Sequence, residues 1–139
     1  MPLDSLVVLR GGGDLGTGVA HRLVRAGYRV VVLETSAPGA VRRRVAFAEA
    51  VLSGETTVEG VTARRLPASE VASAWAGGRG GCDAGARAPW VPVVVDPSGD
   101  CIDDLAPDVI VDARMAKRNL GMRRDDAPLT ARQRVLLSV

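Results

Sequence analysis

Three glycines near the N-terminus have the spacing of a loop that holds phosphate. Gly11, Gly13 and Gly16 fit the pattern G-x-G-x-x-G, and an acidic residue, Glu34, follows about twenty residues later. In such a loop the first glycine permits a tight turn, the second lets the backbone approach a pyrophosphate, and the third lets a helix pack closely against the sheet. The free N–H groups at the start of that helix attract an anion. The alternative interpretation is a tight turn that only joins a strand to a helix.

The residues on both sides of this loop predict a strand, a helix and a second strand. Residues 7–9 are apolar and predict a buried strand that ends at Arg10, and residues 28–34 predict the second strand. Between them, residues 14–26 predict a helix that ends near Gly27. Its apolar face is formed by Leu15, Val19, Leu23 and Val24. Because such crossovers are nearly always right-handed, we expect the two strands to be parallel.

The charges around the loop bear on the ligand that it would take. Glu34 is suited to accept hydrogen bonds from ribose hydroxyls, and its charge would repel a 2′-phosphate, which favours NAD over NADP. The arginines at 42–44 lie close enough in sequence to bind a 2′-phosphate, so NADP is kept as an alternative ligand. A solvated helix start is the more ordinary interpretation of this run. Asp14 is unfavourable beside a phosphate unless it caps the helix. The predicted cofactor-binding residues are Gly11, Gly12, Gly13, Asp14, Gly16 and Glu34.

A second group of charged residues follows a predicted strand at 108–114. The group consists of Asp112, Arg114, Lys117, Arg118 and Asn119. Ligands of open α/β sheets bind outside the carboxyl ends of the strands, where this group should fall. Arg114 and Arg118 would bind a phosphate or carboxylate through paired hydrogen bonds, and Lys117 would act as a point charge. Asp112 would orient one of these basic side chains. Arg10 is predicted to face the same crevice. The alternative interpretation is a solvated basic surface loop.

The middle of the chain predicts a helix and then strand structure. Residues 41–54 predict a helix that ends at Gly54 and has Val41, Val45, Ala48 and Leu52 on one face. Residues 57–67 fit either one bulged strand or a hairpin. Residues 68–75 predict a short helix, and residues 76–89, rich in Gly, Ala and Arg, predict a flexible loop.

The last third predicts a strand at 91–96, a short helix at 102–105 and the strand at 108–114. Residues 116–139 are expected to form an irregular C-terminal segment. The length of 139 residues suits one domain, and 47% hydrophobic but only 3% aromatic residues predict an aliphatic core, as in buried parallel strands. We therefore expect a single α/β, Rossmann-like domain over residues 1–139, with a mostly parallel sheet and helices on both faces.

Composition argues against several classes of function. Few aromatic residues and a net charge of +2 from interleaved acids and bases argue against nucleic-acid and membrane binding. Cys82, Cys101 and His21 lack the spacing of a zinc site, so no metal is expected. The first apolar run is too short for a signal peptide and no stretch is long enough to span a bilayer, which predicts a cytoplasmic setting. No Ser-His-Asp, H-E-x-x-H or Tyr-x-x-x-Lys pattern occurs, and whether the chain is an enzyme stays open.

Several stretches together resemble one known family. "LVVLRGGGDLGTGVAHRLVRAGYRVVVLE", "AVRRRVAFAEAV", "VEGVTARR", "VPVVVDPSG" and "PDVIVDARMAKRNLG" resemble the selenium-dependent molybdenum hydroxylase system protein family. The resemblance implies a Rossmann-like fold and a role in maturing or supporting xanthine dehydrogenase-type molybdenum hydroxylases. Members are about twice as long and continue beyond "DDAPL" with a glycine-rich strand and turn, so the resemblance covers the N-terminal half only and the chain resembles a truncated member.

Three functions follow as hypotheses. The first is an accessory protein that binds a nucleotide-like or phosphate-bearing ligand, such as a molybdopterin-type cofactor, and whose partners are a molybdenum hydroxylase or its maturation proteins. The second is an NAD-dependent oxidoreductase or a fragment of one. The third is a degenerate, truncated domain that binds no ligand. Self-association into a homo-oligomer is left open.

Overall fold

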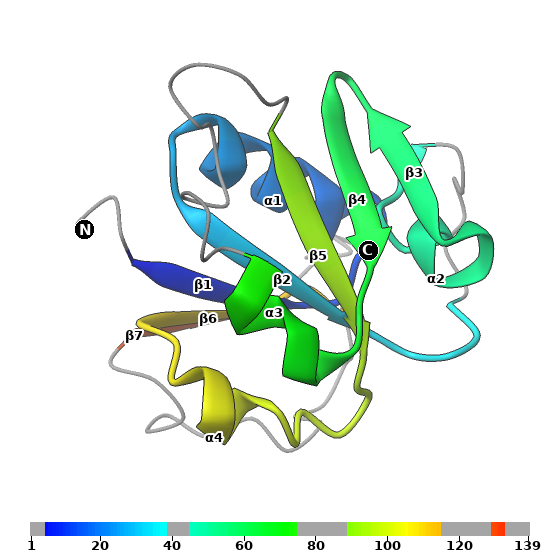
Figure 1. Ribbon diagram of the computed structural model, residues 1–139. Coiled ribbons are helices and arrows are strands. Elements are labelled where there is room, and N and C mark those ends of the chain that lie inside the picture. Colours follow the sequence, from blue (N-terminus) through cyan, green and yellow to red (C-terminus); the bar gives the residue numbers. More distant parts are fainter. Residues whose placement is uncertain (1–4, 39–44, 75–88, 115–128, 133–139) are drawn as a thin grey trace, which may run out of the picture.

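A sheet of seven strands, with helices packed on both faces, organises the chain (Figure 1). The computed structural model describes residues 5–38, 45–74, 89–114 and 129–132. The strands are β1 (Leu6–Arg10), β2 (Arg29–Glu34), β3 (Glu55–Val58), β4 (Val61–Arg65), β5 (Trp90–Val95), β6 (Val109–Asp112) and β7 (Leu129–Arg132). The helices are α1 (Asp14–Arg25), α2 (Glu49–Ser53), α3 (Ala68–Ala74) and α4 (Ile102–Leu105).

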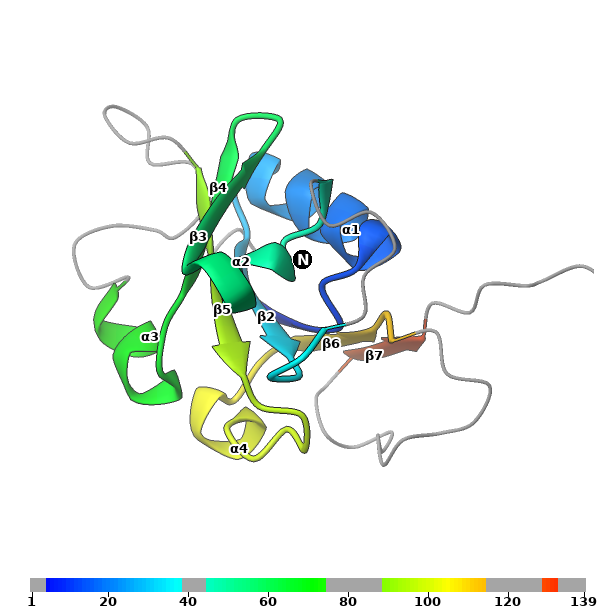
Figure 2. The same cartoon turned by 90° about the vertical axis from the view of Figure 1, so that its right-hand side faces the viewer.

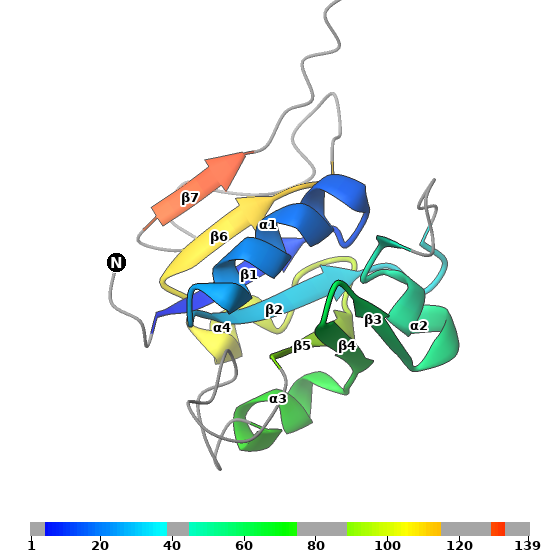
Figure 3. The same cartoon turned by 90° about the horizontal axis from the view of Figure 1, so that it is seen from above.

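The strand order is β3-β4-β5-β2-β1-β6-β7, and every neighbouring pair is parallel except β3 with β4 (Figure 3). From β1 the chain adds β2, continues to the far edge of the sheet at β3, returns inward through β4 and β5, and then crosses over to add β6 on the other side of β1. This reversal creates a switch point between β1 and β6, the place where ligands bind in doubly wound sheets. The α/β class and the mostly parallel sheet predicted from the sequence are confirmed.

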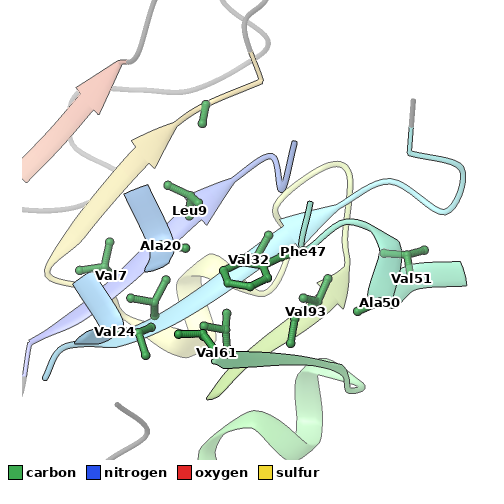
Figure 4. Packing of buried hydrophobic residues seen from close by; sticks show 14 of the residues in the cluster. Val7, Leu9, Ala20, Val24, Val32, Phe47, Ala50, Val51, Val61 and Val93 are labelled. Carbon is green, nitrogen blue, oxygen red and sulfur yellow. The ribbon is translucent and has the colours of Figure 1, made fainter. Parts of the chain in front are cut away.

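The parallel strands are buried on both faces, which explains their continuous apolar sequences. Val7 and Leu9 of β1 face a cluster that includes residues of α1 and Phe47 (Figure 4), whereas Leu6 and Val8 face a second cluster near α3 and α4. Figure 2 shows α1 on one side of the sheet and α3 with α4 on the other. The predicted placement of helices on both faces is therefore confirmed.

Helix α1 has the predicted bounds, and of the four residues predicted for its apolar face, Val19, Leu23 and Val24 pack against the core whereas Leu15 does not. Leu15 is 37% exposed, and the buried residues of the helix are Gly16, Thr17, Ala20 and Val24. The prediction of the face was wrong at Leu15 because small residues, not large ones, let the helix approach the end of β1. Glycine at position 16 is required, since a Cβ atom there would overlap the carbonyl oxygen of Gly11.

The helix predicted at 41–54 is present in only the second half of the described part of that range. Helix α2 begins only at Glu49, and Val45 and Leu52, predicted to be buried, are 46% and 50% exposed. The backbone before α2 is instead bonded to the glycine loop, because the N–H groups of Phe47 and Ala48 donate to Thr17 and Gly12. Residues 39–44, including Val41 and the arginines at 42–44, lie outside the described residues.

The hairpin alternative for residues 57–67 is the observed one. Strands β3 and β4 pair antiparallel through a turn in which Glu59 and Gly60 have φ angles of 46° and 81°. The turn is tied to α1, since Arg25 Nη2 donates to Glu59 O at 3.1 Å and His21 Nε2 lies 3.1 Å from the same oxygen. His21 therefore supports the hairpin.

The elements predicted after the hairpin agree with α3, β5, α4 and β6 to within about two residues at each end. The irregular segment predicted at 116–139 is wrong in part, because β7 lies within it and pairs parallel with β6. A four-residue strand is too short to show a pattern in the sequence. The predicted flexible loop at 76–89 lies outside the described residues except for Pro89. None of the helices in the described ranges has the length and apolar character needed to cross a bilayer.

Two glycines of α1 provide a matched test of this packing. Gly16→Ala should lower the free energy of unfolding by about 2 kcal/mol or more, because the new methyl group meets the Gly11 carbonyl and must push the helix from the sheet. Gly18→Ala should raise it by about 0.5–1 kcal/mol, because position 18 is exposed and nothing lies within 4 Å of the added atom. Urea denaturation measures both values. Equal effects of the two substitutions would contradict the proposed role of Gly16.

Candidate functional site

The fold brings the two chemically suggestive segments together at the switch point. Gly11 has a φ of +100° and donates its N–H to Leu33 O at 2.9 Å. Its α-carbon faces the end of β6 so closely that an added Cβ would lie 3.1 Å from the backbone of Ala113 and from the nitrogen of Arg114. Ala113 N–H also donates to Arg10 O at 2.8 Å. The glycine loop and the start of the "DARMAKRN" segment are thus neighbours, although about a hundred residues separate them.

The start of α1 is open at this place. Gly13 occupies the N-cap position with an extended conformation (φ −71°, ψ −168°) and no side-chain hydrogen bond caps the helix. Nothing lies within 4 Å of a Cβ atom built on Gly13. Asp14 is the first residue of the helix and not its N-cap. It therefore lacks the capping role that would make its charge compatible with a bound anion. The first turn presents backbone N–H groups and the positive end of a twelve-residue helix.

Glu34 at the end of β2 is bonded to the glycine loop. Its Oε1 atom accepts the N–H of Gly12 at 2.9 Å, and its Oε2 atom accepts the N–H of Thr35 at 2.7 Å. A carboxylate offers about four lone-pair positions, so these two bonds leave capacity for further donors such as ribose hydroxyls. Glu34 therefore orients the loop and can still contact a ligand.

Thr17 is a positioning residue that the sequence analysis missed. Its side chain is buried, and Oγ1 donates to Gly12 O at 3.0 Å while accepting the N–H of Phe47 at 2.9 Å. Ala48 N–H donates to the same Gly12 oxygen at 2.9 Å. The loop is thus fixed from behind by the segment before α2. A threonine one turn into a helix carries no sequence signal for this role, because the partner segment is thirty residues away.

Asp112 and Arg114 form a closely paired ion pair at the end of β6. Arg114 Nε and Nη2 donate to the two carboxylate oxygens at 2.9 and 2.7 Å, and Arg114 N–H donates to Oδ1 at 3.1 Å. The Arg114 side chain is 17% exposed and the Asp112 side chain 8%. Burial opposes ionisation of Asp112, but these bonds and the charges of Arg114 and Arg10 outweigh it and lower its pKa. Asp112 thus orients Arg114, as the sequence suggested.

Arg10 lies in the same group of charges. It is 4% exposed, occupies the register position beside Asp112, and donates from Nη2 to Pro97 O at 3.1 Å. Its side chain lies on the face of the sheet that carries α4, since Leu6 and Val8 of the same strand face that side. Arg10 and Arg114 set two positive charges against the one of Asp112 beneath the switch point.

The loop after β5 supports Arg10. Asp96 accepts backbone N–H groups from Gly99, Asp100 and Cys101 at 3.1, 3.1 and 2.9 Å, and these bonds with that of the Cys101 thiol lower its pKa despite burial. Burial and the neighbouring Asp96 raise the pKa of the Cys101 thiol to about 12. Cys101 is therefore protonated at neutral pH and is no nucleophile.

Several predicted site residues are not placed. Lys117, Arg118 and Asn119 lie outside the described residues, so their part in the site stays a prediction. Within the described ranges, no group of three or more His, Cys, Asp or Glu side chains is arranged to hold a metal ion. The described geometry places the open start of α1 beside the Asp112–Arg114 pair, with Glu34 bonded to the loop. None of the side chains just discussed is a nucleophile of lowered pKa.

Comparison with known proteins finds one curated relative. The chain is 48% identical over 125 residues to a protein of Escherichia coli (strain K12) described as "Uncharacterized protein YqeB". The match covers 90% of the chain but 21% of that protein, so the chain spans about a fifth of the relative's length. No family model matches the chain, and no solved structure matches it.

Replacing the carboxylate of Asp112 should expose its contribution to stability. Asp112→Asn leaves the buried Arg114 guanidinium without its counter-charge, and the free energy of unfolding at pH 7 should fall by about 3 kcal/mol. Because the pKa of Asp112 is below its ordinary value of 3.8, the carboxylate stabilises the fold fully above that pH and loses this effect as the pH falls through the lowered pKa.

The difference between wild type and Asp112→Asn should therefore shrink below pH 4 in urea titrations at several pH values. Asp103→Asn is the control, because Asp103 is exposed on α4 and its loss should change stability by about 0.5 kcal/mol or less. A difference that grows on acidification would contradict the assigned sign.

Proposed function

We propose that this chain binds a nucleotide-like, phosphate-bearing small molecule through the glycine loop, and that it serves as an accessory or maturation protein of a molybdenum hydroxylase system. The observation that carries the binding proposal is the uncapped start of α1 directly beside the end of β6. Backbone N–H groups at a helix start and a nearby guanidinium group are the donors that phosphate prefers in proteins.

The local charge balance supports an anion at this position. The guanidinium groups of Arg10 and Arg114 lie beside Asp112 at the ends of β1 and β6. The helix start adds a partial positive charge from the other side of the loop. Glu34 lies one strand further, where it would face ribose hydroxyls and not the phosphate.

The accessory role rests on the resemblance of the glycine loop and the "DARMAKRN" segment to the selenium-dependent molybdenum hydroxylase system family. A molybdopterin-type cofactor carries a phosphate that the loop would bind, and the partners would be the hydroxylase or its maturation proteins in the cytoplasm. Binding and transfer of the cofactor, with no covalent step on this chain, is the mechanism that we infer.

Substitution of Gly13 separates ligand binding from folding. Gly13→Asp should stabilise the unliganded helix by a few tenths of a kcal/mol, about the advantage of an aspartate N-cap over glycine. The same carboxylate occupies and repels the anion position, so affinity for pyrophosphate should fall by about tenfold or more. Isothermal titration calorimetry with pyrophosphate and ADP measures the affinity, and thermal unfolding measures the stability.

Gly13→Asn is the matched control, since it has nearly the same shape and capping ability without the charge. It should bind pyrophosphate more tightly than Gly13→Asp. If the wild-type chain binds neither pyrophosphate nor ADP, the loop is a structural turn and the proposed function is wrong.

A dinucleotide-dependent oxidoreductase is the second candidate, and Glu34 is the observation that favours it. Its carboxylate ends the strand next to β1 and holds the N–H of Gly12, the position expected of the ribose-binding acid in a dinucleotide site. The hydride-transfer group would have to come from elsewhere, because the described crevice supplies no evident proton donor or acceptor for a substrate.

This candidate predicts a preference that depends on one charge. The wild-type chain should bind NAD more tightly than NADP, because Glu34 repels a 2′-phosphate. Glu34→Gln keeps an acceptor for Gly12 N–H but removes the charge. It should therefore lower the affinity for NAD and bring the ratio of the NAD and NADP affinities closer to one. Calorimetric titration with each dinucleotide measures the ratio. Equal binding of NAD and NADP by the wild type excludes Glu34 from the ribose position.

A further inference from the structure

An open hollow lies beyond the glycine loop at the carboxyl ends of β4 and β5. It has a volume of about 320 Å³ and is lined by Arg65, Leu66, Pro67 and Val95. Three of these four side chains are apolar, and the volume is at the lower end of the ~300–1,000 Å³ usual for small-molecule pockets. The hollow has no role in the phosphate-binding site described above.

The sheet register relates this hollow to Glu34 and the loop. Val95 of β5 lies beside Glu34 of β2, and β2 is the neighbour of β1, which leads into the glycine loop. Val93 and Val32, two residues earlier on each strand, share the cluster beneath α1, so Val95 and Glu34 lie on that same face. Two strand spacings, about 10 Å, separate β5 from β1.

We propose that this hollow binds the nucleobase of a ribonucleotide whose phosphate lies at the glycine loop and whose ribose lies at Glu34. The inference rests on the proposed function and adds the class of ligand. Phosphate, ribose and base follow one another in the same order as the anion site, the hydroxyl acceptor and the apolar hollow, which occur at the ends of β1, β2 and β5.

The lining residues suit an aromatic heterocycle. Leu66 and Val95 provide aliphatic surface for the ring. The Arg65 guanidinium donates from Nη1 to Val51 O at 2.9 Å, and its planar shape suits stacking on a flat ring. None of the four lining side chains is an amide or carboxylate that would read one base. The hollow should therefore favour nucleotides over phosphates without a base, and discriminate little between bases.

The experiment compares ligands that share the phosphate but differ in the base. Calorimetric titration of the 139-residue chain uses pyrophosphate, ribose 5-phosphate, ADP and CDP. The wild type should bind ADP and CDP with similar affinity, and both about tenfold more tightly than pyrophosphate or ribose 5-phosphate. Leu66→Ser removes one apolar side chain of the lining. It should lower the affinity for ADP by about tenfold and leave the affinity for pyrophosphate unchanged.

Two further variants make the test independent of folding. Val95→Thr keeps the side-chain shape but adds a hydroxyl group, so it should lower the affinity for ADP. The affinity for pyrophosphate and the melting temperature should stay near the wild-type values. Leu52→Ser is the control, because Leu52 is an equally apolar, 50% exposed side chain on α2 that does not line the hollow, and it should change neither affinity.

The outcomes separate this inference from the proposed function. If pyrophosphate binds but ADP and CDP bind no more tightly, the hollow takes no base, and the phosphate site stands alone. If Leu66→Ser weakens pyrophosphate as much as ADP, the side chain acts through the fold and the inference is wrong. If none of the four ligands binds, both the proposed function and this inference are wrong.

Discussion

The close approach of α1 to the end of β1 is the constraint on which the rest of the structure depends. Without a side chain at position 16, the helix backbone comes against the carbonyl of Gly11, and this contact sets the direction in which the helix leaves the loop. Thr17, the next residue, then reaches Gly12 and Phe47 with its hydroxyl. One small residue thereby fixes the loop, the helix and the segment before α2 relative to one another, and the open helix start at Gly13 is a consequence.

The parallel sheet converts this local packing into a site with distinct regions. Because the carboxyl ends of all its parallel strands meet at one edge, groups far apart in sequence line up across it. The charged trio of Arg10, Asp112 and Arg114 lies at the ends of β1 and β6, and Glu34 lies at the end of β2. The buried ion pair keeps its charges at neutral pH because each partner satisfies the other with good geometry. This arrangement of guanidinium groups beside a separate carboxylate is the basis of our proposal that the ligand carries both phosphate and hydroxyl groups.

The titratable groups beside the ends of β5 and β6 are each held in one protonation state. Asp96 and Asp112 accept backbone or guanidinium donors, which stabilises their charged forms, and Cys101 is held as a thiol by burial and by Asp96. Groups with these properties are poor proton carriers near neutral pH. The binding and transfer that we propose for this chain would need fixed hydrogen-bond donors and would not need such proton carriers.

The sequence by itself determined the strand–helix–strand unit, the order of most elements and the identity of the glycine loop, because these depend on local periodicity and on glycine spacing. It predicted that Asp112 orients one of the basic side chains that follow it, and the structure shows that Arg114 is bonded in this way. Tertiary structure alone decided the exposure of Leu15 on α1, the shortening of α2 and the roles of Thr17 and Asp96. The helix predicted before Glu49 is replaced by bonds from Phe47 and Ala48 to the glycine loop and α1, and Val45 is exposed. Such bonds join residues about thirty or more positions apart, and no short-range pattern encodes them.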